Sequence, residues 1–218
     1  MIPKLEVLFD DVGGSEVPEY GGDPRWTGVA VNFVESLDGI VALPEANRES
    51  GGVVSGGSRA DHFVMGLLRA CADAVLVGAG TLRVSPRDRW HADAIFPEAK
   101  DLYASIGKLQ PPLYVATRSG NIPPKDLTVV AGTPREMIDR IRADGRQRIL
   151  CEGGPSLFSE LAAAGLVDEI FLTLSPRLFG RTGARKTLVE KDLGGAPFEL
   201  RSLRRDGSHL FLRYRKNQ

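Results

Sequence analysis

The sequence is poor in the residues that build metal sites and disulfide frameworks. Its 218 residues include only two cysteines, Cys71 and Cys151, and three histidines. Two cysteines cannot form a zinc ribbon, and His62, His91 and His209 are too scattered for metal-ligand spacing. We therefore expect no metal and no disulfide, and we interpret both cysteines as small buried side chains.

Excess charge and long apolar runs are also missing. Lys plus Arg and Asp plus Glu each number 28, so the formal net charge is zero. Such a chain has no global field that attracts nucleic acid or a membrane surface, and local arginines and backbone N–H groups must hold any anionic ligand. No apolar run approaches the roughly 20 residues of a transmembrane helix. Residues 1–14 lack the pattern of a signal peptide, so we expect a cytoplasmic protein.

Hydrophobic patterning predicts strands that alternate with helices over most of the chain. Short apolar runs predict strands at 28–36, 74–77, 113–117, 127–131, 148–151 and 169–174. Capping signals and apolar periodicity predict helices that begin at Ser58, Thr133 and Pro155. The C-terminal segment alternates around Asp206-Gly207, which is typical of an antiparallel hairpin. We expect a three-layer α/β/α fold, whose mostly parallel central sheet has antiparallel C-terminal strands.

The first 27 residues differ from the rest of the chain. They are rich in Gly, Pro and acidic residues without a clear period, and we interpret them as an N-terminal arm that wraps the domain or a partner. Residues 28–218 contain no internal repeat or linker, which predicts a single domain. Within it, residues 44–57 are expected to form a mobile loop and residues 82–101 a long surface segment.

Residues 150–156 (LCEGGPS) join a predicted strand to a predicted helix. Gly153 and Gly154 carry no Cβ, so the backbone can approach a ligand closely. Pro155 suits the first helical position, where its missing N–H costs nothing. The remaining N–H groups and the helix dipole form a site for phosphate. Glu152 stands at the carboxyl end of the strand, where open α/β sheets bind their ligands.

Residues 75–81 (VLVGAGT) form a second glycine-containing turn after a buried strand. Taken alone, Gly78 and Gly80 indicate only a tight turn. Two such turns in one parallel sheet predict a shared groove, where the Thr81 hydroxyl can donate to a phosphate. The GxGxxG fingerprint is incomplete and no acid follows about 20 residues later, which argues against a Rossmann domain.

Several segments, taken in order, resemble the reductase domain of riboflavin biosynthesis, the C-terminal domain of the bacterial deaminase/reductase. They are SLDG (36–39), LLRACAD (67–73), AVLVGAGTL (74–82), EGGPSL (152–157), GLVDE (165–169) and LSPRLFG (174–180). The likeness covers roughly residues 28–215, and that family is similar in fold to dihydrofolate reductase. The HxE and PCxxC motifs of the zinc deaminase often fused to it are not among these residues, which resemble the reductase part alone.

The resemblance implies an NADPH-dependent reductase of a ribosylaminopyrimidine 5′-phosphate. Hydride would pass to C1′ of the ring-opened ribosylimine and give a ribitylamino product. The cofactor would lie against Asp61, Gly78, Gly80, Thr81, Gly153, Gly154, Pro155, Ser156 and Leu157. The substrate would lie against Ser55, Arg69, Arg87, Arg89 and Glu152, since guanidinium groups match phosphate oxygens. A cis Gly153–Gly154 bond and a homodimer are further expectations.

A proton donor would make the imine more electrophilic, and Asp38 and Glu152, each at a strand end, are the candidate acids. Structural roles compete with these assignments. Asp38 lies in a Leu-Asp-Gly turn, and Asp61 stands three residues after Ser58 in a capping-box arrangement. Arg69 lies in the last turn of its helix, where a cation suits the dipole, and Arg87 and Arg89 suit a solvated loop.

One departure from the family pattern bears on the substrate. Most relatives carry Asp-Asp-Pro after the first glycine turn, and the second acid touches the substrate. This chain has Val84-Ser85-Pro86. Three functions therefore stay open: a pyrimidine reductase, a reductase of the same fold that acts on dihydrofolate or another pterin, and a nucleotide-binding protein without reductase activity.

Overall fold

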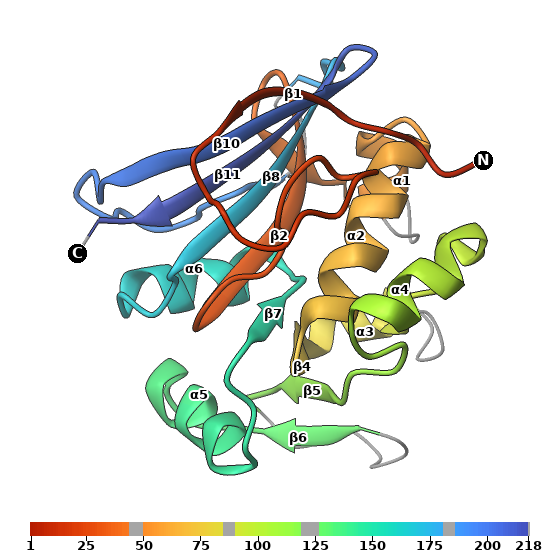
Figure 1. Cartoon of the computed structure of the whole chain (residues 1–218). Coiled ribbons are helices and arrows are strands. Elements are labelled where there is room, and N and C mark those ends of the chain that lie inside the picture. Colours follow the sequence, from red (N-terminus) through yellow and green to blue (C-terminus); the bar gives the residue numbers. More distant parts are fainter. Residues whose placement is uncertain (44–49, 85–89, 119–126, 181–185, 218) are drawn as a thin grey trace.

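A nine-stranded sheet forms the frame of the computed structural model, which describes residues 1–43, 50–84, 90–118, 127–180 and 186–217 (Figure 1). The strand order is β1-β10-β11-β8-β2-β7-β4-β5-β6. The strands are β1 (Glu6–Asp10), β2 (Val29–Ser36), β4 (Ala74–Gly78), β5 (Leu113–Ala116), β6 (Thr128–Val130), β7 (Ile149–Cys151), β8 (Glu169–Ser175), β10 (Phe198–Asp206) and β11 (His209–Lys216). A separate two-stranded sheet pairs β3 (Ile40–Ala42) with β9 (Lys186–Thr187).

The pairing directions confirm the predicted sheet. Strands β8, β2, β7, β4, β5 and β6 run parallel to one another. Strands β1, β10 and β11 extend this sheet antiparallel. The β10–β11 hairpin turns at Asp206, which pairs with His209, as the Asp206-Gly207 signal predicts.

Helices cover both faces of the sheet (Figure 1). They are α1 (Ser50–Val54), α2 (Arg59–Cys71), α3 (Ala79–Val84), α4 (Lys100–Ile106), α5 (Pro134–Ala143) and α6 (Pro155–Ala163), with a 3₁₀ turn at Pro97–Ala99. One core cluster joins β2 to α2 and α4 through Ala30, Phe63 and Tyr103. The opposite cluster joins Val31 of the same strand to Ile141 of α5 and to α6. Neighbouring residues of β2 thus point to opposite faces, as a strand requires.

Helix α2 packs closely on α4. Ser58 caps it, and its side chain accepts a 3.2 Å hydrogen bond from the Asp61 backbone N–H. A Cβ added to Gly66 would lie 2.5 Å from the Ala92 carbonyl oxygen and 2.6 Å from the Tyr103 hydroxyl, so this glycine lets the two segments meet. Tyr103 donates to the Phe63 carbonyl at 2.9 Å, which links α4 back to α2.

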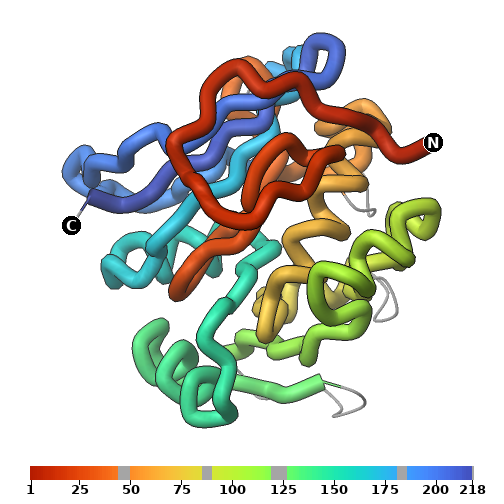
Figure 2. Tube along the Cα trace, in the orientation of Figure 1, coloured from red at the N-terminus to blue at the C-terminus, as the bar shows by residue number. Residues whose placement is uncertain are grey.

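The N-terminal arm is bound to the C-terminal hairpin, and Figure 2 shows its path across β10 and β11. β1 pairs with β10, and two buried arginines of the hairpin hold the segment that follows. The Arg204 guanidinium donates to the Tyr20 carbonyl at 2.8 Å and to the Asp10 carboxylate at 2.5 Å. Arg213 donates to the Asp23 carbonyl at 2.8 Å. Both arginine side chains are 1% exposed, and their buried hydrogen bonds join the arm to the sheet.

Several expectations of the sequence are wrong. Part of the supposed loop 44–57 forms α1, and the first glycine turn continues into α3 instead of a loop. The supposed surface segment 82–101 contributes buried residues to the core, namely Trp90, Ala92, Phe96 and Ala99. The strands β3 and β9 were not predicted.

Cys71 and Cys151 are both buried and free, as predicted. In the part of the chain that the structure describes, no helix has the length and hydropathy of a membrane span.

Candidate active site

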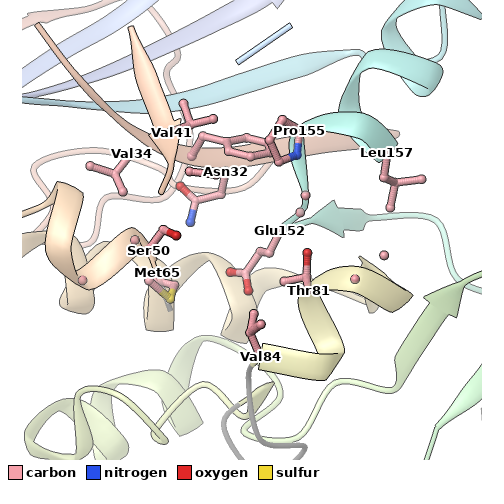
Figure 3. A pocket seen from close by; sticks show the side chains of 18 of the residues that line it. Asn32, Val34, Val41, Ser50, Met65, Thr81, Val84, Glu152, Pro155 and Leu157 are labelled. Atoms are coloured by element: carbon pink, nitrogen blue, oxygen red, sulfur yellow. The ribbon is translucent and has the colours of Figure 1, made fainter. Parts of the chain in front are cut away.

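A cavity of about 590 Å³ lies beside the carboxyl ends of β7 and β4 (Figure 3). Its walls come from β2, β3, α1, α2, α3 and the residues that open α6. The amide of Asn32, the hydroxyl of Ser50 and the carboxylate of Glu152 lie around the same space in Figure 3. Its volume falls within the range of small-molecule and cofactor sites, about 300–1,000 Å³.

The two glycine turns form one continuous wall of this cavity. The Gly78 backbone N–H donates a 2.7 Å hydrogen bond to the Gly153 carbonyl. The Gly153–Gly154 peptide bond is cis, as predicted. A Cβ on Gly154 would lie 3.1 Å from the Thr81 hydroxyl oxygen, and one on Gly153 would lie 3.3 Å from it. The absence of side chains therefore lets the Thr81 hydroxyl sit directly on the second turn.

The first turn of α6 faces the cavity without a side-chain cap. Gly154 is the N-cap residue, and Pro155 occupies the first helical position. The first N–H groups of a helix have no partner within it. Pro155, Ser156 and Leu157 all line the cavity, and no acidic residue occupies this first turn. The N-terminal end of α6 therefore offers backbone donors and a positive dipole to the cavity.

Arg69 and Glu152 form a buried ion pair in the cavity wall. Arg69 Nη2 lies 2.7 Å from Glu152 Oε2, and Nε lies 2.9 Å from Oε2 and 3.1 Å from Oε1. The two side chains are 3% and 5% exposed. The guanidinium also lies 5.2 Å from the Trp90 ring centroid and donates to the His91 carbonyl at 3.3 Å. To give a proton to a substrate, Glu152 would first have to leave Arg69 and take up a proton itself.

Asp61 is the other buried carboxyl group of the cavity wall, and it is 6% exposed. Burial raises its pKa to about 6, and the neighbouring Glu152 adds to that shift. A hydrogen bond with Thr173 and the electrostatic influence of His209 act in the opposite direction. The Asp61 side chain lines the cavity, and its backbone N–H donates to the Ser58 side chain that caps α2.

The structure does not bring Asp38 to the cavity. Its carboxylate accepts hydrogen bonds from Ser36 Oγ at 2.5 Å, from the Phe179 N–H at 3.2 Å and from the Gly180 N–H at 2.6 Å. The Ser36 hydroxyl, followed by these backbone donors, lowers the Asp38 pKa. Asp38 thus fastens the segment after β8 to the turn after β2, which is a structural task.

Ser55 is also outside the cavity lining. It is fully buried, its hydroxyl donates to the Gly52 carbonyl at 3.3 Å, and its own carbonyl lies 2.9 Å from His209 Nε2. Ser50, five residues earlier, lines the cavity in its place.

The remaining predicted residues divide into two groups. Gly78, Gly80, Thr81 and Val84 line the cavity with those described above, whereas Arg87, Arg89, Ser85 and Pro86 lie outside the described residues. Sequence reasoning missed Asn32, Ser50, Trp90 and Lys186. Asn32 had a readable signal, since it is the polar residue within the apolar run GVAVNFV. Among the described residues, no three His, Cys, Asp or Glu side chains gather as a metal site.

Comparison with known proteins identifies relatives in sequence and in fold. The family model described as the RibD C-terminal domain matches residues 27–212. The 2,5-diamino-6-ribosylamino-4(3H)-pyrimidinone 5′-phosphate reductase of Methanothermobacter thermautotrophicus is 28% identical over 186 residues, which cover 74% of this chain and 83% of that protein.

Solved structures extend the likeness. A pyrimidine reductase-like protein of Corynebacterium diphtheriae has a TM-score of 0.63 and 20% identity, over 88% of this chain and 92% of that one. Acinetobacter baumannii RibD has a TM-score of 0.67 and 19% identity, over 88% of this chain and 58% of its own length. Dihydrofolate reductase of Enterococcus faecalis, complexed with NADP(H), has a TM-score of 0.54 and 13% identity, over 88% and 97%.

These likenesses confirm the predicted dihydrofolate reductase-like fold. The family match covers most of the chain, and the curated relative is a reductase, so the prediction of a reductase of this type is confirmed as well. The chain belongs to the RibD C-terminal domain family.

Proposed function

We propose that this chain is an NADPH-dependent reductase of a ribosylaminopyrimidine 5′-phosphate in riboflavin biosynthesis. Family membership and the named activity of the Methanothermobacter relative support the reaction class. One observation carries the cofactor assignment: the two glycine turns meet through the bond from Gly78 to Gly153 and form one wall at the uncapped end of α6.

The residues of this wall fit a dinucleotide diphosphate. Backbone N–H groups at the start of α6 and the hydroxyl groups of Thr81 and Ser156 are hydrogen-bond donors of the kind that phosphate oxygens accept. Side chains at Gly153 and Gly154 would fill the space over Thr81. The reduced nicotinamide supplies the hydride when it is bound, and the protein holds it against the substrate and excludes water.

The opposite side of the cavity suits a flat, polar ring. The Asn32 amide offers both donors and an acceptor, and Ser50 adds a hydroxyl. Glu152 is held in one orientation by Arg69, so its carboxylate oxygens present a fixed negative edge. We propose that these groups bind the amino and carbonyl substituents of the pyrimidine and orient the sugar-bearing nitrogen.

Val84 supports a second candidate class of substrate. It stands at the first position of the family's Asp-Asp-Pro motif and lines the cavity, and Figure 3 shows its side chain on the Glu152 side of the space. The next residue, Ser85, replaces the second acid, which touches the substrate in those relatives, so the chain lacks that carboxylate for a ribosyl substrate. A reduced requirement for that group would favour a pterin such as dihydrofolate, which is the second candidate.

Binding and turnover can be measured separately on the full chain. We expect NADPH to quench the protein fluorescence when it binds. We expect its affinity for the chain to be higher than that of NADH. Addition of the ribosylaminopyrimidine phosphate should then lower the absorbance of reduced nicotinamide, with a ribityl product found by mass spectrometry. Turnover of dihydrofolate alone would favour the pterin reductase, and tight NADPH binding without turnover of any substrate would favour a nucleotide-binding protein. Absence of NADPH binding would overturn the proposal.

We further propose that the chain works as a homodimer in the cytoplasm. β1 is an edge strand of the sheet, and Val7, Leu8 and Phe9 are 44%, 47% and 44% exposed on it. Exposed apolar residues on a strand edge are a common feature of association surfaces. Sedimentation velocity of the chain and of a Phe9→Lys variant tests the dimer, which the lysine should weaken.

A further inference from the structure

Residues 186–191, which we call the strap, lie along α6. The Glu190 backbone N–H donates to Ser159 Oγ at 2.8 Å. One residue later, Lys191 Nζ donates to Glu160 Oε2 at 2.7 Å. These contacts hold the strap against the middle of the helix and bring its first residues to the cavity.

The start of the strap meets the N-terminal end of α6 through three polar side chains. Ser156 Oγ donates to Glu190 Oε2 at 2.7 Å. Lys186 Nζ lies 3.2 Å from Ser156 Oγ, 3.2 Å from Glu190 Oε2 and 3.1 Å from Glu190 Oε1. Lys186 and Ser156 both line the cavity. The Ser156 hydroxyl and the Lys186 ammonium group, both in the cavity lining, are therefore already bonded to one carboxylate.

The Glu190 carboxylate stands where an anion is favoured. The first turn of α6 contains no acidic residue and its cap supplies no side-chain acceptor. A carboxylate from the strap therefore meets the positive end of the helix from outside. The Ser156 hydroxyl, followed by Lys186, lowers the Glu190 pKa, in keeping with a carboxylate held in its charged form.

This arrangement can open. The side chains of Lys186 and Glu190 are 42% and 34% exposed, and ion pairs at such exposure contribute little to stability. A dinucleotide diphosphate carries more charge than a carboxylate and offers several acceptor oxygens. It can therefore compete for the same donors at small cost to the fold.

We propose that Lys186 binds the diphosphate of the dinucleotide and that Glu190 is its internal competitor. Arrival of the diphosphate displaces the Glu190 carboxylate from Lys186 and Ser156, and both donors then turn to phosphate oxygens. Glu190 thereby lowers the affinity for the cofactor. This inference rests on the proposed function, because it requires the cofactor to lie at the start of α6.

The test measures the affinity of the full chain for NADPH. Binding is monitored by fluorescence quenching at several salt concentrations. Lys186→Met should weaken binding about tenfold, the effect of losing one charge-assisted hydrogen bond. Glu190→Gln keeps the size of the side chain and an acceptor for Ser156 but removes the charge, and should tighten binding roughly threefold or more. Lys191→Met is the matched control: it breaks an ion pair of the same strap that lies outside the cavity lining, and it should leave affinity within about twofold.

Salt dependence and competition supply independent readouts. Lys186→Met should flatten the dependence of affinity on salt, because one cation no longer meets the ligand. Inorganic pyrophosphate should compete with NADPH more strongly in Glu190→Gln than in the unmodified chain. Thermal unfolding of each variant without ligand establishes that the comparison is made on folded protein.

The outcomes separate the two proposals. If the unmodified chain fails to bind NADPH, the proposed function and this inference both fail. If it binds and Lys186→Met matches the Lys191→Met control, the inference is overturned and the proposed function stands. If Glu190→Gln weakens binding, Glu190 is a structural fastening of the strap and its role as competitor is wrong.

Discussion

Arg69 and Glu152 are joined by three short hydrogen-bond contacts across the boundary between α2 and the end of β7, with both side chains almost fully buried. In the wall of the cavity, the pair joins a helix to the end of a strand through opposite charges. Its geometry makes each partner dependent on the other.

Breaking this pair from one side should destabilise the protein strongly. Glu152→Leu leaves the Arg69 guanidinium buried without its carboxylate, and we expect a loss of about 3–5 kcal/mol in the free energy of unfolding. Arg69→Met should cost a similar amount. The double variant should lose much less than the sum, because no buried charge remains unpaired. Urea unfolding measures all three, and strictly additive losses would contradict the coupling.

Asp61 should make stability depend on pH in a direction unusual for a carboxylate. Its pKa is raised from 3.8 to about 6 by burial. Between these values the folded state binds more protons than the unfolded state, so the free energy of unfolding falls as pH rises from about 4 to 6. Above about pH 6 the loss of stability caused by the charged Asp61 is constant. Asp61→Asn should raise the free energy of unfolding there by roughly 2–3 kcal/mol.

Chemical unfolding at a series of pH values measures this slope. Asp38→Asn is the opposite control, since the Asp38 pKa is lowered by Ser36 and two backbone N–H groups. Its contribution is present above the unfolded pKa and is lost as pH falls through the folded one. An unchanged pH profile in Asp61→Asn would contradict the assignment.

Gly66 should resist replacement although it lies inside a helix. Alanine normally favours a helix over glycine by about 1 kcal/mol. At this position its Cβ would lie 2.5 Å from the Ala92 carbonyl oxygen and 2.6 Å from the Tyr103 hydroxyl. We expect Gly66→Ala to cost about 1–3 kcal/mol, as overpacking does. Gly52→Ala in α1, whose added Cβ meets nothing within 4 Å, is the control, and a melt that ranks the two variants in reverse would refute this packing argument.

The N-terminal arm should detach when Arg204 is shortened. Arg204→Met removes the hydrogen bonds to the Tyr20 carbonyl and the Asp10 carboxylate. We expect a loss of about 2–4 kcal/mol and faster proteolysis within the first 22 residues. The neighbouring Arg205→Met removes only an exposed ion pair with Glu6 and should change little. Equal protection of the arm in both variants would contradict the role of Arg204.

The sequence predicted those parts of the fold whose burial follows a simple period. The four residues of β5 are all buried, and its apolar run is readable as a strand. Helix α5 carries a full capping box at Thr133 and Glu136. By contrast, only Tyr103 is fully buried in α4 and no residue is fully buried in α3. These helices have seven and six residues, which is too short for a clear apolar period. Strand β9 has only two residues, too few for any pattern, and its partner β3 pairs with it outside the main sheet.

The residues of the site also differ in how far the sequence predicts them. The two glycine turns were predicted to meet because parallel strands end at one edge of the sheet, and Gly78 does contact Gly153. Asp38 and Glu152 looked equivalent as acids at strand ends, yet Asp38 is turned toward Phe179 and Gly180 by contacts 141 and 142 residues apart in sequence. The Lys186 contact with Ser156 likewise spans 30 residues. No local pattern encodes such contacts.

The position of β2 sets an order for folding on the ribosome. This strand lies between β7 and β8, and Val29 is paired with Ile149, which is synthesised 120 residues later. At translation rates of about 5–20 residues per second, an apolar segment near the start of the chain waits on the order of 6–24 s for its neighbours. Nascent chains that stop before Ile149 should therefore hold residues 29–36 exposed to chaperones, and chains that extend past β8 should release them.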